Sequence, residues 1–114
     1  MSINRINRIN EEVKKEASSI IRELKDPRIS SMTSIIAVDV AKDMRVCKIF
    51  VSVLGDEKVQ TDTVNGLRSA AGFVRKEIGH RLDLRYTPEV EFVLDHSIEH
   101  GAHINRILRG ISEE

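Results

Sequence analysis

The sequence is poor in the residue types on which several kinds of site depend. Its 114 residues include one cysteine, two prolines, one tyrosine, three phenylalanines and no tryptophan. The single cysteine, Cys47, excludes an internal disulfide and any metal site held by several cysteines, and its apolar neighbours predict a small buried side chain. The scarcity of aromatic residues argues against an aromatic platform that stacks bases on a sheet.

Long apolar segments are also missing. No run approaches the ~18 residues that span a bilayer, and the amino terminus has no apolar stretch typical of a secretory signal. These absences predict a cytoplasmic protein with no membrane contact. The length permits one domain, residues 1–114, with a single modest core.

An excess of charge of one sign is absent as well, because 18 basic residues are balanced by 18 acidic ones. Taken alone, this balance gives no sign of a nucleic-acid binder, which usually carries a basic excess. The charges are nevertheless unevenly distributed. Residues 1–25 carry six bases and four acids, residues 68–85 carry five and two, and residues 86–114 carry two and six. We therefore expect a bipolar molecule.

Hydrophobic periodicity predicts the first half of the fold. Apolar residues at steps of three and four indicate an amphipathic helix from Ile3 to about Lys25, which Asp26 and Pro27 end. An antiparallel hairpin is expected next, with a turn at residues 41–44 and a second strand over residues 45–54. The side chains expected on the inner faces of its two strands are Ile36, Val38 and Val40, and Cys47, Ile49, Val51 and Val53.

Helical periodicity returns from about Thr61 to Leu82, but three glycines in this stretch make a single straight helix unlikely. A third strand is expected over residues 89–94 and a last helix after Ser97, its expected N-cap. The order is helix, strand, strand, broken helix, strand, helix. It predicts an α+β domain with the helices on one side of a three-stranded sheet.

The broken helix has a basic side. On an ideal helix, Arg68, Gly72, Arg75 and Gly79 would share one face. Glycine lets another backbone approach closely, and arginine pairs with phosphate through a planar fork, so this face fits a sugar-phosphate backbone. Spacing alone favours a plainer interpretation, in which the glycines mark helix ends and the arginines are ordinary solvated side chains.

Five segments, taken in order and spacing, carry a resemblance to a known family. They are Leu24-Lys-Asp-Pro-Arg28, Ile36-Ala-Val-Asp-Val40, Cys47-Lys-Ile-Phe-Val-Ser-Val53, Ala70-Ala-Gly-Phe-Val-Arg75 and Leu84-Arg-Tyr-Thr-Pro-Glu-Val-Glu-Phe92. Along essentially its whole length the chain resembles bacterial ribosome-binding factor A. The resemblance implies a type II KH-like domain with a mixed sheet, in which an Ala-x-Gly kink replaces the usual GxxG loop. That kink falls on Ala70, Ala71 and Gly72.

The resemblance also implies a function. Members of this family bind the immature small (30S) ribosomal subunit and its 16S rRNA, assist late maturation and rRNA processing, and support growth in the cold. They do so without catalysis or a cofactor. A monomer is expected, and ribosomal proteins and a ribosome-associated GTPase are candidate additional partners. The predicted RNA contacts are Arg68, Arg75, Lys76, Arg81 and Arg85, with Arg5, Arg8 and Lys15 as outer contacts.

Other groups of residues carry weaker hypotheses. The spacing of His96, His100 and His103 is compatible with a metal site. No cysteine is near, however, and Glu99 is the one carboxylate between them, so no metal is expected. The segment from Asp95 to Ser97 is better explained as a strand exit and helix cap than as catalytic machinery.

Two further alternatives remain at this point. Arg28 is a candidate RNA contact, although ending a helix and turning the chain is the simpler role for the Asp26-Pro27-Arg28 segment. The alternative function is a small protein-interaction module whose basic helices bind an acidic protein partner without touching RNA.

Overall fold

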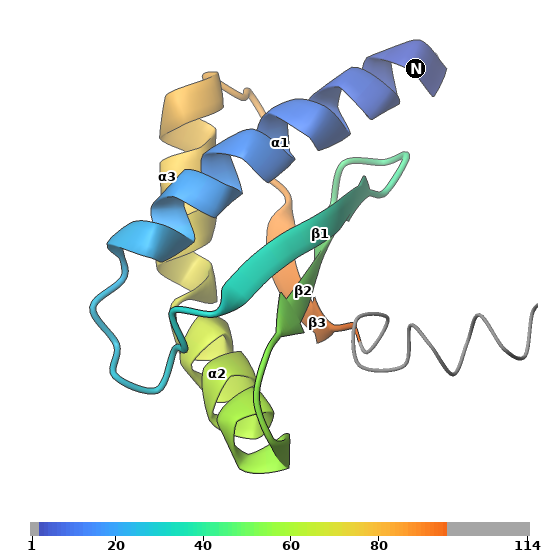
Figure 1. Cartoon of the computed structure of the whole chain (residues 1–114). Coiled ribbons are helices and arrows are strands. Elements are labelled where there is room, and N and C mark those ends of the chain that lie inside the picture. Colours follow the sequence, from blue (N-terminus) through green and yellow to red (C-terminus); the bar gives the residue numbers. More distant parts are fainter. Residues whose placement is uncertain (1–2, 96–114) are drawn as a thin grey trace, which may run out of the picture.

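The computed structural model describes residues 3–95 of the chain. Three helices and three strands follow one another in the order helix, strand, strand, helix, helix, strand (Figure 1). They are α1 (Ile3–Glu23), β1 (Thr33–Val40), β2 (Val46–Val53), α2 (Glu57–Ser69), α3 (Ala71–Leu82) and β3 (Glu89–Leu94). This order confirms the α+β class for the part of the chain described. The helix expected after Ser97 lies outside the described residues.

The sheet is mixed, with β2 in the middle. It pairs antiparallel with β1 and parallel with β3. The inner face of β2 is formed by Cys47, Ile49, Val51 and Val53, all 3% exposed or less. Their alternation along the strand is the one predicted, because successive side chains of a strand point to opposite faces.

The prediction for β1 was wrong at one position. Ile35 is buried, at 8% exposure, whereas Ile36 is only partly buried. The pairing with β2 shifts between Ile35 and Ala37, so the strand bulges there and one extra residue enters the ladder. The bulge reverses the alternation on its amino-terminal side, which is why Ile35 takes the place expected for Ile36.

The core lies between the sheet and the helices. In Figure 1, α1 and α3 lie side by side against the sheet, with α1 in contact with β1 and α3 in contact with β3. The buried side of α1 presents Val13, Ala17 and Ile20, each fully buried, at the three- and four-residue steps expected of an amphipathic helix. The predicted placement of the helices on one side of the sheet is confirmed for the helices described.

The expected break in the second helical stretch is present, although the stretch begins earlier than predicted. Asp56 caps α2 by accepting a hydrogen bond from the Val59 backbone N–H at 2.9 Å, so the helix starts at Glu57 rather than near Thr61. Ala70 separates α2 from α3 and is the kink residue between them. The kink therefore lies within the predicted Ala-x-Gly segment.

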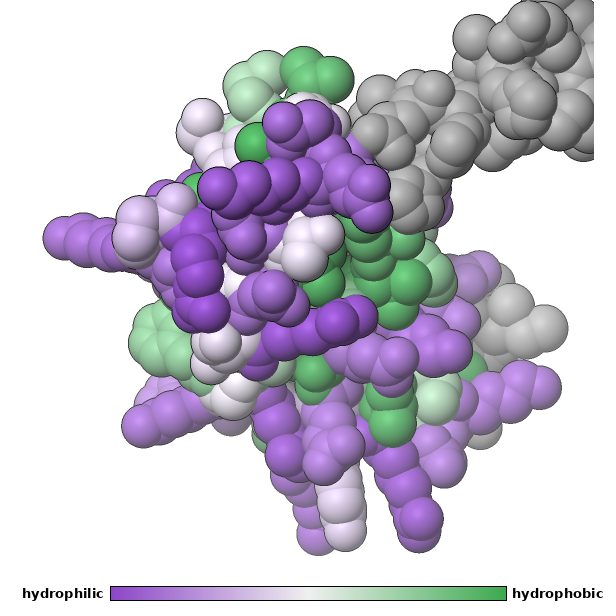
Figure 2. Space-filling view, turned by 90° about the horizontal axis from the view of Figure 1, so that it is seen from below, coloured by the Kyte–Doolittle hydropathy of each residue, from purple (hydrophilic) through white to green (hydrophobic). Residues whose placement is uncertain are grey.

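The surface is mostly polar. Figure 2 shows hydrophilic side chains over most of the face seen from below, with hydrophobic groups gathered towards its middle. Among the helices of the described part, none combines the length and the apolar character that crossing a membrane requires.

Candidate nucleic-acid interface

The three glycines of the kinked pair have different surroundings. A Cβ added at Gly66 would lie 2.7 Å from the Ile29 side chain, and one added at Gly79 would collide with Thr87. At Gly72 nothing lies within 4 Å of the added atom. Gly66 and Gly79 thus allow close packing inside the protein, whereas the backbone at Gly72 is open to a partner outside it.

Gly72, Arg75 and Lys76 lie on one face of α3, because residues three and four apart on a helix are neighbours. The Arg75 guanidinium donates two hydrogen bonds, at 3.1 and 3.0 Å, to the backbone carbonyl of Thr87. Arg75 is exposed, so it both holds the segment before β3 and presents positive charge to solvent. No side chain caps the first turn of α3, and the positive end of its helix dipole lies beside these cations.

Several of the predicted RNA contacts already have partners within the protein. Arg81 bridges α3 and α1, donating to Glu23 at 3.1 Å and to Ser19 at 3.4 Å, and its side chain is only 27% exposed. Arg8 forms an exposed ion pair with Glu12 at 3.4 Å. Arg68 and Lys15 are exposed on α2 and α1. The structure thus gives Arg81 a role in joining two helices, whatever it also contacts.

The structure brings Arg5 and Arg85 together at a cleft of about 560 Å³. Its walls come from the start of α1, the β1–β2 turn and the loop between α3 and β3. The lining residues are Arg5, Ile9, Lys42, Asp43, Met44, Arg45, Leu84, Arg85 and Tyr86. Four of these side chains are cationic and one is anionic, so the cleft suits a negatively charged ligand.

Two smaller hollows continue this cleft towards the kink. The first, of about 370 Å³, shares Met44, Arg45 and Tyr86 with the cleft and adds Arg75. The second, of about 220 Å³, shares Arg75 and the carboxylate Glu89 with the first and includes Gly72. We call this connected surface the basic track and define it by Arg5, Lys42, Arg45, Gly72, Arg75 and Arg85.

Sequence reasoning missed Lys42, Arg45 and Tyr86. The turn at residues 41–44 was predicted, but nothing in its composition shows that β2 and β3 run parallel from the same end of the sheet. That pairing places the turn beside the start of β3, where the Glu89 N–H donates to the Arg45 carbonyl at 2.9 Å. The signal that could have found these residues is the resemblance itself, through the sheet topology it implies.

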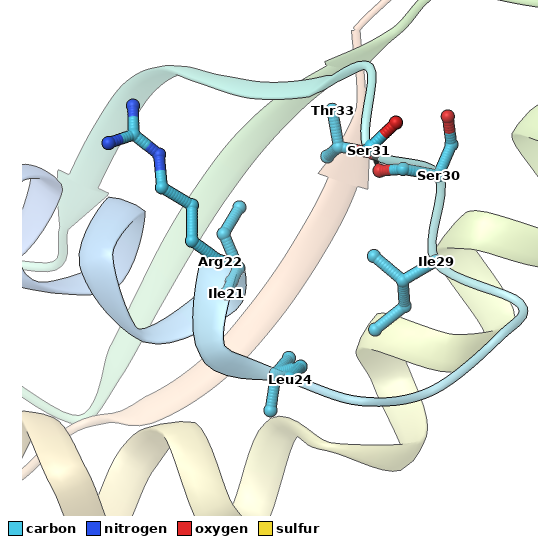
Figure 3. A pocket seen from close by; sticks show the side chains of 7 residues that line it. All are labelled: Ile21, Arg22, Leu24, Ile29, Ser30, Ser31 and Thr33. Atoms are coloured by element: carbon cyan, nitrogen blue, oxygen red, sulfur yellow. Dashed lines mark hydrogen bonds between the residues drawn. The ribbon is translucent and has the colours of Figure 1, made fainter.

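A second surface feature lies at the other end of α1. A hollow of about 220 Å³ lies between the end of α1 and the following loop. Figure 3 shows Ile21, Arg22 and Leu24 on one side of it. Ile29, Ser30, Ser31 and Thr33 line the other side. It contains none of the predicted RNA contacts.

The loop beside this hollow is held by Arg28 and by Thr63. The Arg28 guanidinium forms an ion pair with the Asp26 carboxylate at 2.6 Å. The hydrogen bonds from the Arg28 side chain hold the pKa of the Asp26 carboxyl below its ordinary value. The fully buried Thr63 hydroxyl donates to the Arg28 carbonyl at 3.3 Å and accepts from the Ser30 N–H at 3.2 Å. This geometry supports the turn interpretation of the Asp26-Pro27-Arg28 segment.

Metal binding has no support within residues 3–95, where no group of three or more histidine, cysteine and carboxylate side chains is arranged to hold an ion. The hypothesis weighed for His96, His100 and His103 concerns residues outside that range. Cys47 is fully buried, and burial raises the pKa of its thiol from 9.0 to about 12.

Comparisons with known proteins agree with the resemblance. Residues 5–108 match the family model described as "Ribosome-binding factor A". A ribosome-binding factor A of Clostridium tetani is 58% identical over 114 residues, which cover 99% of this chain and 94% of the relative. A Thermotoga maritima protein whose structure was solved by NMR is 30% identical with a TM-score of 0.73, covering 82% of this chain and 89% of that one.

A further solved structure shows the same fold. It is a model of the Thermus thermophilus ribosome binding factor A fitted into a cryo-EM map of a 30S complex. It superposes with a TM-score of 0.65 at 23% identity, covering 76% of this chain and 91% of that one.

Proposed function

The chain belongs to the ribosome-binding factor A family, and from that premise we propose that it binds the immature small (30S) ribosomal subunit and its 16S rRNA. In this role it assists late maturation and rRNA processing, supports growth in the cold, and acts by binding rather than by catalysis. We place the whole chain, residues 1–114, in one domain that works as a monomer in the cytoplasm. Ribosomal proteins and a ribosome-associated GTPase are candidate further partners.

The observation that carries this proposal is the basic track. It joins the open backbone at Gly72 to cations from four separate parts of the chain. An RNA backbone needs close approach at some points and positive charge at others, and the track offers both along one connected surface. Lys76 and Arg68, exposed on either side of the kink, extend the positive charge beyond it.

A charge reversal beside the kink tests the proposal. We expect Arg68→Glu combined with Lys76→Glu to weaken association with immature small subunits about tenfold or more, because two phosphate contacts become repulsive. Arg75 is left unchanged in this variant, since its removal would also release the Thr87 carbonyl. Co-sedimentation with purified immature subunits measures the effect, and far-UV circular dichroism checks the fold.

The matched control carries the same change of net charge at exposed positions away from the track, Lys25→Glu with Lys58→Glu. We expect it to bind like the unaltered chain. If about four cations contact phosphates, log affinity should also fall with log salt at a slope near −3 to −4. Unaltered binding by the variant at residues 68 and 76 would remove the kink surface from the interface. Binding to subunits but never to naked rRNA would instead favour the protein-interaction module.

A further inference from the structure

The cleft at one end of the basic track combines positive charge with an exposed aromatic ring. Tyr86 is 76% exposed, more than Met32, Leu54 or Phe73, the other large hydrophobic residues at the surface of the described part. It borders both the cleft and the adjoining hollow. An exposed ring among cations suits a ligand that has both a flat aromatic face and negative charge.

The charges around Tyr86 favour an anion. Arg85 precedes it in the chain, and Arg5, Lys42 and Arg45 line the same cleft. The single carboxylate there, Asp43, accepts the Arg45 backbone N–H at 3.0 Å and lies 3.9 Å from the Arg45 guanidinium. Asp43 therefore offsets part of one positive charge and leaves the cleft basic. The half-buried side chains of Ile9, Met44 and Leu84 give it an apolar lining.

The backbone around the cleft is strained and fixed. In the part of the chain that the structure describes, the non-glycine residues with left-handed backbone are Met44, at φ 63°, and Asp83, at φ 50°. Met44 lies in the cleft wall, and Asp83 begins the loop that carries Tyr86. The Asp83 conformation is that of the left-handed C-cap that ends α3, whereas Met44 lies in a turn whose geometry the surrounding structure has to enforce.

Hydrogen bonds on both sides enforce the position of the Tyr86 loop. Before the tyrosine, the Leu84 N–H donates to the Gly79 carbonyl at 3.2 Å. After it, the Thr87 carbonyl accepts both hydrogen bonds from Arg75. Tyr86 is thus presented on a short loop that is anchored on both sides, and such anchoring lowers the entropic cost of binding.

We propose that this cleft binds an unpaired nucleotide of RNA. The base stacks on the Tyr86 ring, and the flanking phosphates pair with Arg45 and Arg85. The cleft and its neighbour, at about 560 and 370 Å³, match the size range of small-ligand sites, about 300–1,000 Å³. This inference rests on the proposed function, because it specifies which form of RNA the basic track recognises. A duplex cannot make this contact, since its bases are already stacked on one another.

Fluorescence anisotropy with two labelled probes tests the site: a ten-nucleotide single-stranded oligouridine and a ten-base-pair RNA duplex. We expect Tyr86→Ala to weaken single-strand binding between about five- and a hundredfold, the loss of one base–aromatic stack, while duplex binding changes less than twofold. Tyr86→Phe keeps the ring and should bind the single strand like the unaltered chain. Because Tyr86 is exposed, thermal unfolding of all the variants should coincide.

Phe73→Ala is the matched control, because it removes an exposed aromatic side chain that lines none of the three hollows. We expect no change in single-strand affinity. The inference is overturned if Tyr86→Ala binds oligouridine like the unaltered chain, if Tyr86→Phe loses as much affinity as Tyr86→Ala, or if Phe73→Ala has the same effect. It is also overturned if a polyglutamate peptide displaces the single strand as well as unlabelled oligouridine does, because the cleft would then recognise acidic protein.

Small-subunit binding, measured in parallel, separates this inference from the proposed function. If the variant at residues 68 and 76 loses subunits but Tyr86→Ala keeps its affinity for oligouridine, the nucleotide site is refuted and the proposed function stands. If the unaltered chain binds oligouridine but not immature subunits, the proposed function is refuted independently of the Tyr86 site.

Discussion

At the scale of single residues, three glycines in similar helical sequence contexts have different structural roles. All three interrupt a helical pattern, and helix propensity assigns each the same small cost. The structure separates them by what surrounds them: Gly66 lies against the Ile29 side chain, Gly79 against Thr87, and Gly72 against nothing within the protein. Sequence reasoning correctly placed the break but could not tell which glycine is open, because that depends on loops distant in the chain.

Paired alanine substitutions test this difference. We expect Gly66→Ala to lower the free energy of unfolding by roughly 1–3 kcal/mol, because the new methyl group would lie 2.7 Å from Ile29. Gly72→Ala has room and should raise the free energy of unfolding by about 0.5 kcal/mol through better helix propensity. Urea unfolding of the two variants beside the unaltered chain measures both effects. Equal changes in the same direction would contradict the packing described.

Cys47 gives a prediction about alkaline pH. Burial raises the pKa of its thiol from 9.0 to about 12, so between these values the unfolded chain loses a proton that the folded chain keeps. The contribution of the Cys47 thiol to the free energy of unfolding should therefore be constant below about pH 9 and fall as the pH rises towards 12. The native thiol should also resist thiol reagents at neutral pH, because it is fully buried.

Cys47→Ala is the control for this prediction, because it removes the thiol and leaves every other titrating group. The difference in free energy of unfolding between the unaltered chain and the variant should shrink as the pH rises. A difference that stays constant from neutral pH to the alkaline limit would show that the thiol is not held protonated by the fold.

At the scale of elements, the local patterns predicted the buried face wherever the helix or strand is regular. The inner faces of α1 and β2 follow directly from hydrophobic periods of 3.6 and 2 residues. The errors occur where a single residue changes the geometry. The bulge in β1 places Ile35 in the core instead of the predicted Ile36. The Asp56 cap starts α2 four residues before the predicted Thr61. Neither event changes the hydrophobic composition on which the prediction relied.

The candidate interface was only partly predictable for a related reason. The kink and Arg75 come from one continuous segment, which spacing and the resemblance can identify. The cleft is built from the start of α1, the β1–β2 turn and the loop before β3, which meet through the sheet topology. The sequence alone therefore does not predict that Lys42, Arg45 and Tyr86 form one site, because the sheet topology brings them together.

At the scale of the whole molecule, zero net charge conceals an uneven distribution. The basic track gathers its cations on connected hollows, while residues 86–114 carry most of the excess acid. We expect the opposed charges to weaken long-range attraction to RNA in general, so that binding depends on fitting a particular site. Such binding suits a factor that must leave its partner when assembly is finished.

The central claim, that the basic track and the kinked helix pair face the small subunit, is tested most directly by lysine footprinting. The chain is acetylated with a limiting amount of reagent, free and in a saturated complex with immature small subunits, and the rate at each lysine is read by mass spectrometry. We expect Lys42 and Lys76 to be protected severalfold in the complex, while Lys58, at the far end of α2 from the kink, reacts as in the free chain. Unchanged rates at both Lys42 and Lys76 in a fully bound complex would contradict the claim.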